Sequence, residues 1–352
     1  MRWIKSILWV LAAVLAIVVT VIGAAWIGRP KPLNLEVPSS AGEAAGGSAL
    51  SIDKIRDHVR ALASSSSRVS GYSGAVNAAR LVATELTSMG ITNIDVDKFE
   101  VVVPIVRSAS LSASTPTGNI VIPLHPLWPN LARTSATGPD GITAPIIDGG
   151  RGTEADIARK MLRGSIVVMD WNSNMEWLTV PEFGGKAVIF RAGPKSGGVL
   201  ARNKFLTVPA DIPRYYVEEK DVPLLNSLPG NDTQQVTVKC DMAWEKVTTE
   251  NILARICGGD TQQSSSNPDK SPIVFQTYYD SISVVPDLSP GAEQACNPAV
   301  MLELARFILG LPEKPDRPVY VLFSGGHGQA LAGITHFVRR LKEGVDSGWK
   351  TE

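Results

Sequence analysis

The sequence is poor in cysteine, in aromatic residues and in net charge. Three cysteines occur among 352 residues, and no two of them form a C-x-x-C pair, which argues against a thiolate zinc site. Lysine plus arginine and aspartate plus glutamate both number 34, so no basic excess is available to neutralise phosphates. Aromatic residues make up only 6% of the chain, and no base-stacking surface stands out. We therefore expect no nucleic-acid partner.

The cysteines are Cys240, Cys257 and Cys296, and an oxidising compartment would allow them one disulfide. Cys240 and Cys257 lie on neighbouring predicted strands, so they are the favoured pair. The alternative is that all three are small buried hydrophobic residues. The sequence leaves both interpretations open.

One long hydrophobic run lies at the N-terminus. The segment Ile7–Ile27 has 21 residues without a charge, which is long enough to cross a bilayer as a helix. We interpret it as an uncleaved signal anchor that follows a cytoplasmic tail (residues 1–6) and precedes a Pro-, Gly- and Ser-rich linker (residues 28–48). A cleaved signal peptide is the alternative. The prediction is a single-pass membrane protein with most of its chain in the periplasm or outside the cell.

Helical periodicity and short apolar strands alternate in two parts of the chain. A helix is expected from Ser51, and a second one is expected between a cap at Ser73 and a closing Gly90. Further helices are predicted at residues 298–309 and 330–341, each next to an apolar strand. Strands that alternate with helices indicate a mostly parallel sheet covered by helices on both faces.

The middle of the chain has a different texture. Residues 121–235 contain frequent Pro and Gly, short apolar runs and one helix candidate at residues 154–162, which is typical of a strand-rich inserted lobe. The predicted fold class is therefore α/β, with one domain built from residues 49–120 and 236–352, the inserted lobe, and the N-terminal transmembrane helix. No strand is predicted after the last helix, so we expect the domain to be incomplete at its C-terminus.

Polar side chains gather where two predicted strands end and where the next helix begins. The ends of neighbouring parallel strands meet at one edge of a sheet, and that edge is where sites of α/β folds form. A carboxylate after one strand, a second carboxylate at a helix start and an imidazole after another strand have the layout of a di-metal hydrolase. The candidate site residues are Tyr278, Tyr279, Asp280, Glu293, Gln294 and His327.

Three blocks resemble a known family in their order and spacing: "QTYYDS", "PGAEQACNPAVMLELAR" and "LFSGGHGQALAGITHF". They are similar to the motifs of the co-catalytic di-zinc peptidases, which include bacterial leucyl aminopeptidases and glutamate carboxypeptidase. The block "SSRVSGYSGAVNAARLVATELTSMGI" resembles the N-terminal helices of that family. The segment from "DGGRGTEADIARKMLRGSIVVMD" to "GGKAVIF" resembles the protease-associated domain that is often inserted in such proteins.

Residue by residue, the resemblance implies a degenerate metal site. Tyr278 stands where the family has its first zinc-binding histidine, and a neutral phenol is a weak ligand compared with imidazole. Asp280 matches the aspartate that orients that histidine. Gln294 matches the bridging aspartate and supplies no negative charge, although Glu293, one position earlier, is an alternative if the loop shifts.

The third block departs from the family pattern in the same way. His327 and Gly328 match the Glu-Glu pair that serves as general base and zinc ligand, so a base remains and a ligand is lost. The last two family ligands would lie beyond Glu352. Because several ligands must act together, we expect no tight di-zinc site and no cofactor; zinc is expected only if the protein is active.

The favoured function is that of a membrane-anchored, extracytoplasmic homologue without peptidase activity. It would act as a binding or structural ectodomain for a peptide or protein ligand, as the related transferrin receptor does with the same two domains. One alternative is an active metallo-aminopeptidase, which would hydrolyse N-terminal peptide bonds at a rearranged site with Asp280, Glu293 and His327, the last two as catalytic residues. Another is the ectodomain of a larger membrane transport or envelope assembly.

Several candidates also have a purely local interpretation. His327 lies between glycines and is favoured as a loop residue that hydrogen-bonds nearby. Tyr278 and Tyr279 are predicted at the rim, together with Gln294, but aromatic residues that end a buried strand commonly serve packing. A serine hydrolase with Ser324 as nucleophile is disfavoured, because Leu322 stands where the G-x-S-x-G elbow needs its first glycine.

Overall fold

The computed structural model describes residues 50–193, 201, 203–205, 209–229, 233–258 and 271–344. The predicted anchor at Ile7–Ile27 and the linker after it lie outside these residues. Within the described ranges, none of the helices is long and apolar enough to cross a membrane.

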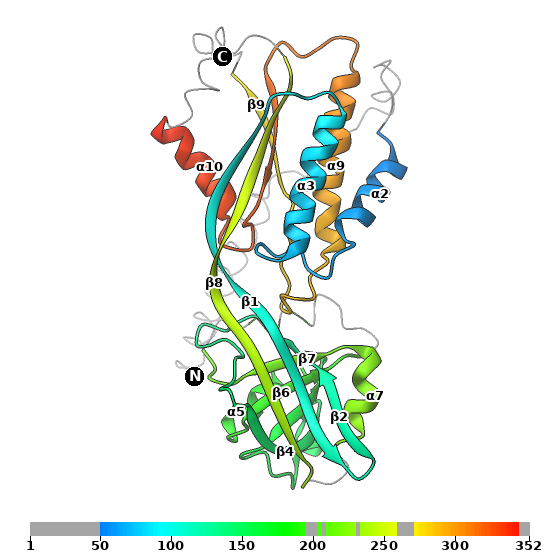
Figure 1. The fold of residues 1–352 in the computed structure, drawn as a ribbon, viewed down its shortest axis with the longest axis vertical. Helices are drawn as coiled ribbons and strands as arrows, with labels where there is room; N and C mark the ends of the chain where they lie inside the picture. The colour runs from blue at the N-terminus through cyan, green and yellow to red at the C-terminus, as the bar shows by residue number, and fades with distance from the viewer. Residues whose placement is uncertain are drawn as a thin grey trace, which may run out of the picture. The chain divides into compact units, whose positions relative to one another are not determined.

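Helices and strands alternate along the described chain (Figure 1). The helices are α2 (Ile52–Leu62), α3 (Ser73–Ser88), α4 (Glu154–Ile157), α5 (Thr179–Glu182), α7 (Val222–Asn226), α9 (Ala292–Gly310) and α10 (Ala332–Glu343), with 3-10 turns η1 (Glu176–Leu178) and η2 (Glu219–Asp221). The strands are β1 (Ile94–Thr115), β2 (Gly118–Pro123), β3 (His125–Pro126), β4 (Ile142–Gly150), β5 (Ile166–Asp170), β6 (Ala187–Arg191), β7 (Arg214–Val217), β8 (Gln235–Cys257), β9 (Ile273–Tyr278) and β10 (Val319–Ser324).

Two unusually long strands form the axis of the sheet. β1 has 22 residues and β8 has 23, and they pair antiparallel from Ile94 opposite Ala254 to Ala113 opposite Val236. A register shift between Val106 and Ser108 marks a bulge in this ladder, which bends and twists the strands locally. Figure 1 shows both strands running from the region of α3 and α9 into the region of β4 to β7.

The sheet is mixed, whereas the sequence predicted a mostly parallel one. β8 pairs antiparallel with β10 near its C-terminal end and with β4 near its N-terminal end. β9 runs parallel to β10, and β4, β5, β6 and β7 run parallel in that order. The α/β class is confirmed. Most of the antiparallel pairs involve β1 or β8. The short apolar runs in the sequence did not indicate that these strands would be so long.

Helices cover both faces of the β8–β10–β9 region, as predicted. Leu86 of α3 and Leu302 of α9 pack with Val321 and Phe323 of β10 on one face, and α2 joins the same cluster. On the other face, Tyr320 and Leu322 pack with Ile334 and Phe337 of α10. Figure 1 shows α2, α3 and α9 on one side of these strands and α10 on the other. The hydrophobic clusters around β4 to β7 also include residues of β1, of β8 and of the loop after β9, among them Leu111, Val238 and Val284.

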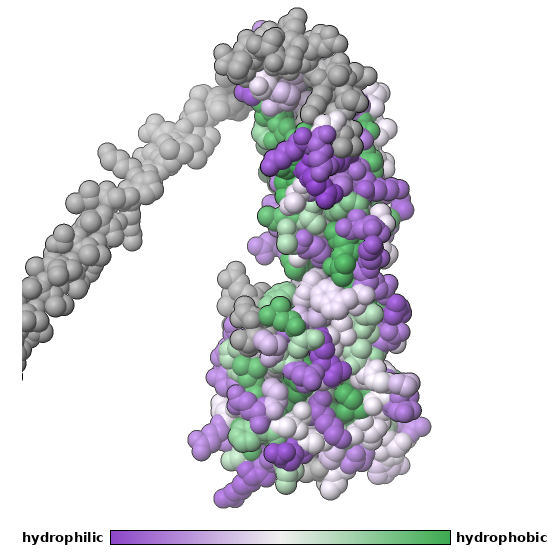
Figure 2. All heavy atoms as spheres, turned by 90° about the vertical axis from the view of Figure 1, so that its left-hand side faces the viewer, coloured by the Kyte–Doolittle hydropathy of each residue, from purple (hydrophilic) through white to green (hydrophobic). Residues whose placement is uncertain are grey.

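Hydrophobic side chains that remain on the surface lie among polar ones. Val102, Val121 and Trp244 are among the exposed large hydrophobic residues of the long strands and of β2. On the face drawn in Figure 2, hydrophobic residues are interspersed with hydrophilic ones. Isolated exposed hydrophobic residues of this kind are normal on protein surfaces.

Backbone conformation explains why three predicted helices have other bounds. Gly291, with φ 60°, precedes the first residue of α9, so this helix begins at Ala292 and contains Pro298 instead of starting there. Ala330 and Leu331 have φ of 55° and 61°, which delays the start of α10 to Ala332. In the lobe, Arg159 has φ 67°, and α4 ends at Ile157 instead of continuing to Leu162.

The predicted Cys240–Cys257 disulfide is wrong. Both residues lie on β8, and both thiols are free. Seventeen residue steps along one extended strand separate them by roughly 56 Å at about 3.3 Å per residue, whereas a disulfide needs Cα atoms within about 7 Å. Two apolar runs that the sequence suggested were separate strands form a single strand. The alternative of a buried hydrophobic residue fits Cys240 only, since Cys257 is half-buried and Cys296 is exposed.

We expect the packing of α9 on the sheet to contribute strongly to stability. Leu302 is fully buried, so Leu302→Ala should lower the free energy of unfolding by about 2–5 kcal/mol, from lost burial and the cavity left behind. Val300, two residues away on α9, is 44% exposed, so Val300→Ala should change it by less than about 0.5 kcal/mol. Urea unfolding followed by circular dichroism measures both values. Equal effects of the two substitutions would contradict this packing.

Candidate functional site

The predicted site segments come together at one edge of the sheet. Tyr278, the last residue of β9, is paired with Ser324, the last residue of β10, because the two strands are parallel and in register. The chain after β9 therefore meets the loop that follows β10. A third segment, residues 66–70 between α2 and α3, lies against both, and Ser67 forms an isolated β-bridge with Ser289.

Asp280 is the centre of this junction and is completely buried. Its Oδ2 accepts hydrogen bonds from the Ser70 hydroxyl at 2.9 Å and from the backbone N–H of His327 at 3.1 Å, and the Gly326 N–H donates to the Ser70 hydroxyl at 3.1 Å. Among the described residues, nothing donates to Oδ1. Burial raises the pKa of Asp280 to about 6, against the opposing effect of these hydrogen bonds. The carboxylate thus joins the β10 loop to the segment before α3.

Hydroxyl groups extend this network into the core. The Ser70 Oγ lies 3.3 Å from the Thr249 hydroxyl, which lies 3.4 Å from the Tyr279 hydroxyl. Tyr279 donates to the Glu250 carbonyl at 2.9 Å. Tyr279 is 1% exposed and its burial raises the pKa of its phenol, so it does not reach the rim that the sequence predicted for it. The alternative, a packing role, describes its position.

Tyr278 and His327 stack on each other. Their ring centroids are 3.7 Å apart and the ring planes differ by 13°. Burial lowers the pKa of His327, which favours the neutral imidazole. His327, which the sequence predicted as a catalytic residue, therefore packs face to face against Tyr278.

Gln294 uses both ends of its amide on the loop after β9. Its Oε1 accepts from the Ile282 N–H at 3.1 Å, and its Nε2 donates to the Ile282 carbonyl at 3.2 Å. A Cβ atom at Gly291 would lie 2.7 Å from the same Oε1, which explains the glycine before α9. Gln294 therefore fastens the first turn of the helix to the loop and is not a side chain that faces an open rim.

Glu293 stays apart from the other candidates. It is exposed in the first turn of α9, where a carboxylate interacts favourably with the helix dipole. Asp280, by contrast, is buried. Among the residues that the structure describes, no three His, Cys, Asp or Glu side chains are arranged to hold a metal ion.

Arg68 is the residue of this site that the sequence analysis missed. Its side chain is completely buried and donates to three backbone carbonyls of the site loop: Tyr279 at 3.1 Å, Pro290, and Gly291 at 3.1 Å. Burial lowers the pKa of the guanidinium, and the negative charge of Asp280 opposes this effect. A single arginine in the serine-rich loop "SSSSRVSGYSG" was the only signal in the sequence.

Backbone hydrogen bonds complete the closure of the loop around Arg68. The Arg68 N–H donates to the Ser289 carbonyl at 2.9 Å, and the Ser281 N–H donates to the Arg68 carbonyl at 3.0 Å. The Ser281 hydroxyl donates to the Ser289 carbonyl at 2.7 Å. The strand end, the loop and the start of α9 are thus joined to one arginine by its side chain and its main chain.

The residues present do not fit a pair of zinc ions. The Tyr278 ring is stacked on His327, and the Gln294 amide is hydrogen-bonded to the backbone of Ile282. A side chain at Gly328 would meet Ile282 Cδ1 at 2.9 Å, so a ligand at this position would require the loop to move. The buried guanidinium of Arg68 adds a positive charge beside these positions, which disfavours a dication further.

Ser324 is not activated as a nucleophile. Its hydroxyl donates to the Thr277 carbonyl at 3.2 Å and accepts from the Gln276 amide at 2.9 Å. The residue is buried, and its hydroxyl is held within the β9–β10 pair. This arrangement agrees with the sequence argument against a serine hydrolase.

The site loop also contacts the strand-rich lobe. The Trp128 N–H donates to the Val284 carbonyl at 2.7 Å, and His125 Nδ1 lies 2.7 Å from an Asp287 carboxylate oxygen. Burial alone would lower the pKa of His125, but Asp287 outweighs it and the pKa is raised. His125 and Asp287 are 162 residues apart in the sequence, so only the fold reveals this contact.

Comparison with solved structures identifies the fold. A zinc aminopeptidase from Bacillus subtilis matches with a TM-score of 0.54 and 18% identity, over 86% of this chain and 67% of that chain. A peptidase M28 precursor from Shewanella amazonensis matches with a TM-score of 0.53 and 18% identity, over 84% and 68%. No protein-family model and no curated protein matches the sequence. The chain therefore has the fold of the zinc aminopeptidases and spans about two thirds of the length of these structures.

Arg68 should be essential for the stability of the site loop. Arg68→Met removes the donors of one buried carbonyl, that of Tyr279, and of two partly buried ones, those of Pro290 and Gly291. A buried acceptor that loses its partner costs about 1–3 kcal/mol, so we expect the free energy of unfolding to fall by about 2 kcal/mol or more. Arg80→Met is the matched control, because Arg80 on α3 is exposed and donates a hydrogen bond to Asn77 within its own helix. Denaturant unfolding measures both. A loss below about 1 kcal/mol for Arg68→Met would refute the assigned role.

The buried carboxyl group of Asp280 should make stability depend on pH. Its pKa in the folded state, about 6, lies above the ordinary value of 3.8, so protonated Asp280 contributes stability that is complete below pH 4 and is lost as pH rises through 6. At about 1.4 kcal/mol per pKa unit, the difference between wild type and Asp280→Asn in the free energy of unfolding should change by about 2–2.5 kcal/mol between pH 4 and pH 7. Denaturation curves across this range test it, and parallel profiles would rule it out.

Proposed function

We propose that this chain is a zinc-peptidase-fold protein without peptidase activity, which acts as a membrane-anchored, extracytoplasmic binding or structural domain. The observation that carries the proposal is the use of the polar groups at the site. Asp280, Gln294 and Arg68 all bond to backbone groups of the loops that surround them. These contacts hold the loops together, and the described part of the chain contains no group of three His, Cys, Asp or Glu side chains for a catalytic metal.

The electrostatics of the site support the same conclusion. A catalytic dication is normally surrounded by several anionic or imidazole ligands. Here the buried carboxylate, Asp280, is already shared by a hydroxyl and backbone N–H groups, and Arg68 supplies a buried positive charge close by. This charge pattern is that of a structural junction between loops and supports the proposal.

The position outside the cytoplasm rests on the sequence. The uncharged run Ile7–Ile27 favours a single membrane anchor, with the peptidase-like fold beyond the bilayer. In that setting, a peptide or another protein is the proposed ligand, because the fold and the absence of a charge excess favour neither nucleic acid nor a strongly charged polymer.

Metal content and hydrolysis test this proposal directly. Full-length protein in detergent, purified in zinc-containing buffer and then desalted, should carry well under one zinc ion per chain by elemental mass spectrometry. It should also leave aminoacyl anilides intact, whereas the Bacillus subtilis zinc aminopeptidase, assayed in parallel, serves as the positive control.

The outcome that would overturn the proposal is equally specific. Two zinc ions per chain together with chelator-sensitive hydrolysis would show an active enzyme. In that case, Glu293→Gln and His327→Ala would test the alternative of a rearranged site, because both residues must then be required for turnover.

A further inference from the structure

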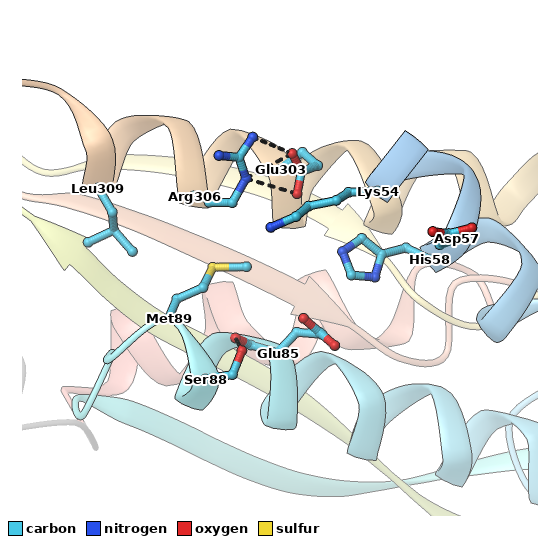
Figure 3. Close-up of a pocket in the computed structure, with 9 residues that line it drawn as sticks. All are labelled: Lys54, Asp57, His58, Glu85, Ser88, Met89, Glu303, Arg306 and Leu309. Carbon is cyan, nitrogen blue, oxygen red and sulfur yellow. Dashed lines mark hydrogen bonds and ion pairs between the residues drawn. The ribbon is translucent and has the colours of Figure 1, made fainter. Parts of the chain in front are cut away.

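A separate cleft lies between α2, α3 and α9, away from the Asp280 junction (Figure 3). Its volume is about 390 Å³, which is in the range of pockets for small molecules. Figure 3 shows Lys54 and His58 extending into it from α2, and Glu85 and Met89 facing them from α3. The residues around it carry charges of both signs, so the identity of a ligand depends on which charges are already neutralised.

The α9 side of the cleft is a closed ion pair. Glu303 is completely buried, and its carboxylate accepts from Arg306 Nε at 2.9 Å and from Arg306 NH2 at 2.6 Å. The Ser51 N–H donates to the same carboxylate at 3.2 Å. Burial would raise the pKa of Glu303, but these partners outweigh it and the pKa is lowered. Glu303 and Arg306 therefore cancel as charges within the cleft.

A second acidic group is also paired outside the cleft. Asp57 on α2 forms an ion pair with Arg60 at 3.1 Å. Both side chains are exposed to solvent, so their field in the cleft is weak. The charges that remain are the ammonium of Lys54 and the carboxylate of Glu85.

Lys54 and Glu85 lie on different helices that face each other across the cleft. Among the residues that the structure describes, neither side chain forms a hydrogen bond or an ion pair, although Lys54 acts on Glu303 through its charge. The His58 imidazole and the Ser88 hydroxyl also line the cleft, and Met89 and Leu309 provide an apolar wall. The cleft thus offers one cation, one anion and one apolar surface.

We propose that this cleft binds a free amino acid or a short peptide in its zwitterionic form. The ligand's carboxylate would interact with Lys54, its ammonium group with Glu85, and an apolar side chain with Met89 and Leu309. Inorganic anions and metal cations fit less well, because each would leave one of the two opposite charges facing a like charge. This site shares no residue with the Asp280 junction, so it stands independently of the proposed function.

Calorimetric titration of the full-length protein with L-leucine tests the proposal. N-acetyl-L-leucine lacks the ammonium group and L-leucinamide lacks the carboxylate, so both should bind at least about tenfold more weakly, as expected for the loss of one charged contact. Lys54→Gln and Glu85→Gln should each weaken binding of L-leucine by a similar factor. Asp53→Asn and Arg80→Gln, exposed on the same two helices but outside the cleft, are the matched controls and should bind as the wild type does.

The cleft variants also separate the two charged contacts. Lys54→Gln should abolish the difference between L-leucine and L-leucinamide, while Glu85→Gln should abolish the difference between L-leucine and its N-acetyl form. Thermal unfolding of each variant confirms that it is folded. Absence of saturable L-leucine binding in the millimolar range, or equal affinity for the three compounds, would overturn the proposal.

Discussion

The antiparallel ladder between β1 and β8 is the constraint on which the rest of the structure depends. It supplies Phe99, Val101 and Val103 to one hydrophobic cluster, and Ile252 and other residues of β8 to the core beneath α3 and α9. Further along, the same two strands supply the core of the strand-rich lobe. Because each strand alternates its side chains between two faces, one ladder organises several cores, and its bulge sets the direction of the second half relative to the first.

At the end of the sheet, backbone carbonyl oxygens of the converging loops need hydrogen-bond donors. Loops that converge on the edge of a sheet bring carbonyl oxygens into a buried place, and each one requires a donor. Arg68 provides several donors from one side chain, and its fork geometry suits carbonyls that lie in different directions. A guanidinium that is bound by neutral carbonyls remains costly to bury. We therefore interpret Arg68 as a residue that holds the loops in position.

The sequence predicted what depends on local pattern and missed what depends on distant partners. Helices α2 and α3 followed from apolar periodicity, although Ser73 is the first residue of α3 and not its cap as predicted. The meeting of Asp280 with the His327 loop followed from parallel strands. The starts of α9 and α10 were missed, because each follows a residue with positive φ, Gly291 or Leu331. For Leu331, the residue type does not indicate such a conformation. Arg68 was missed because its acceptors lie more than two hundred residues away, a separation that no local motif encodes.

The continuity of β1 and β8 has a consequence for how the lobe could have been acquired or could be removed. A domain on a flexible tether can be excised at its linkers and leave its host intact. Here a cut at the sequence-predicted borders of the lobe would leave the far ends of two strands as an unsupported ribbon, and a two-stranded ribbon is marginal in water. The lobe is therefore continuous with β1 and β8, and exchanging it for another domain would require both strands to be joined in register.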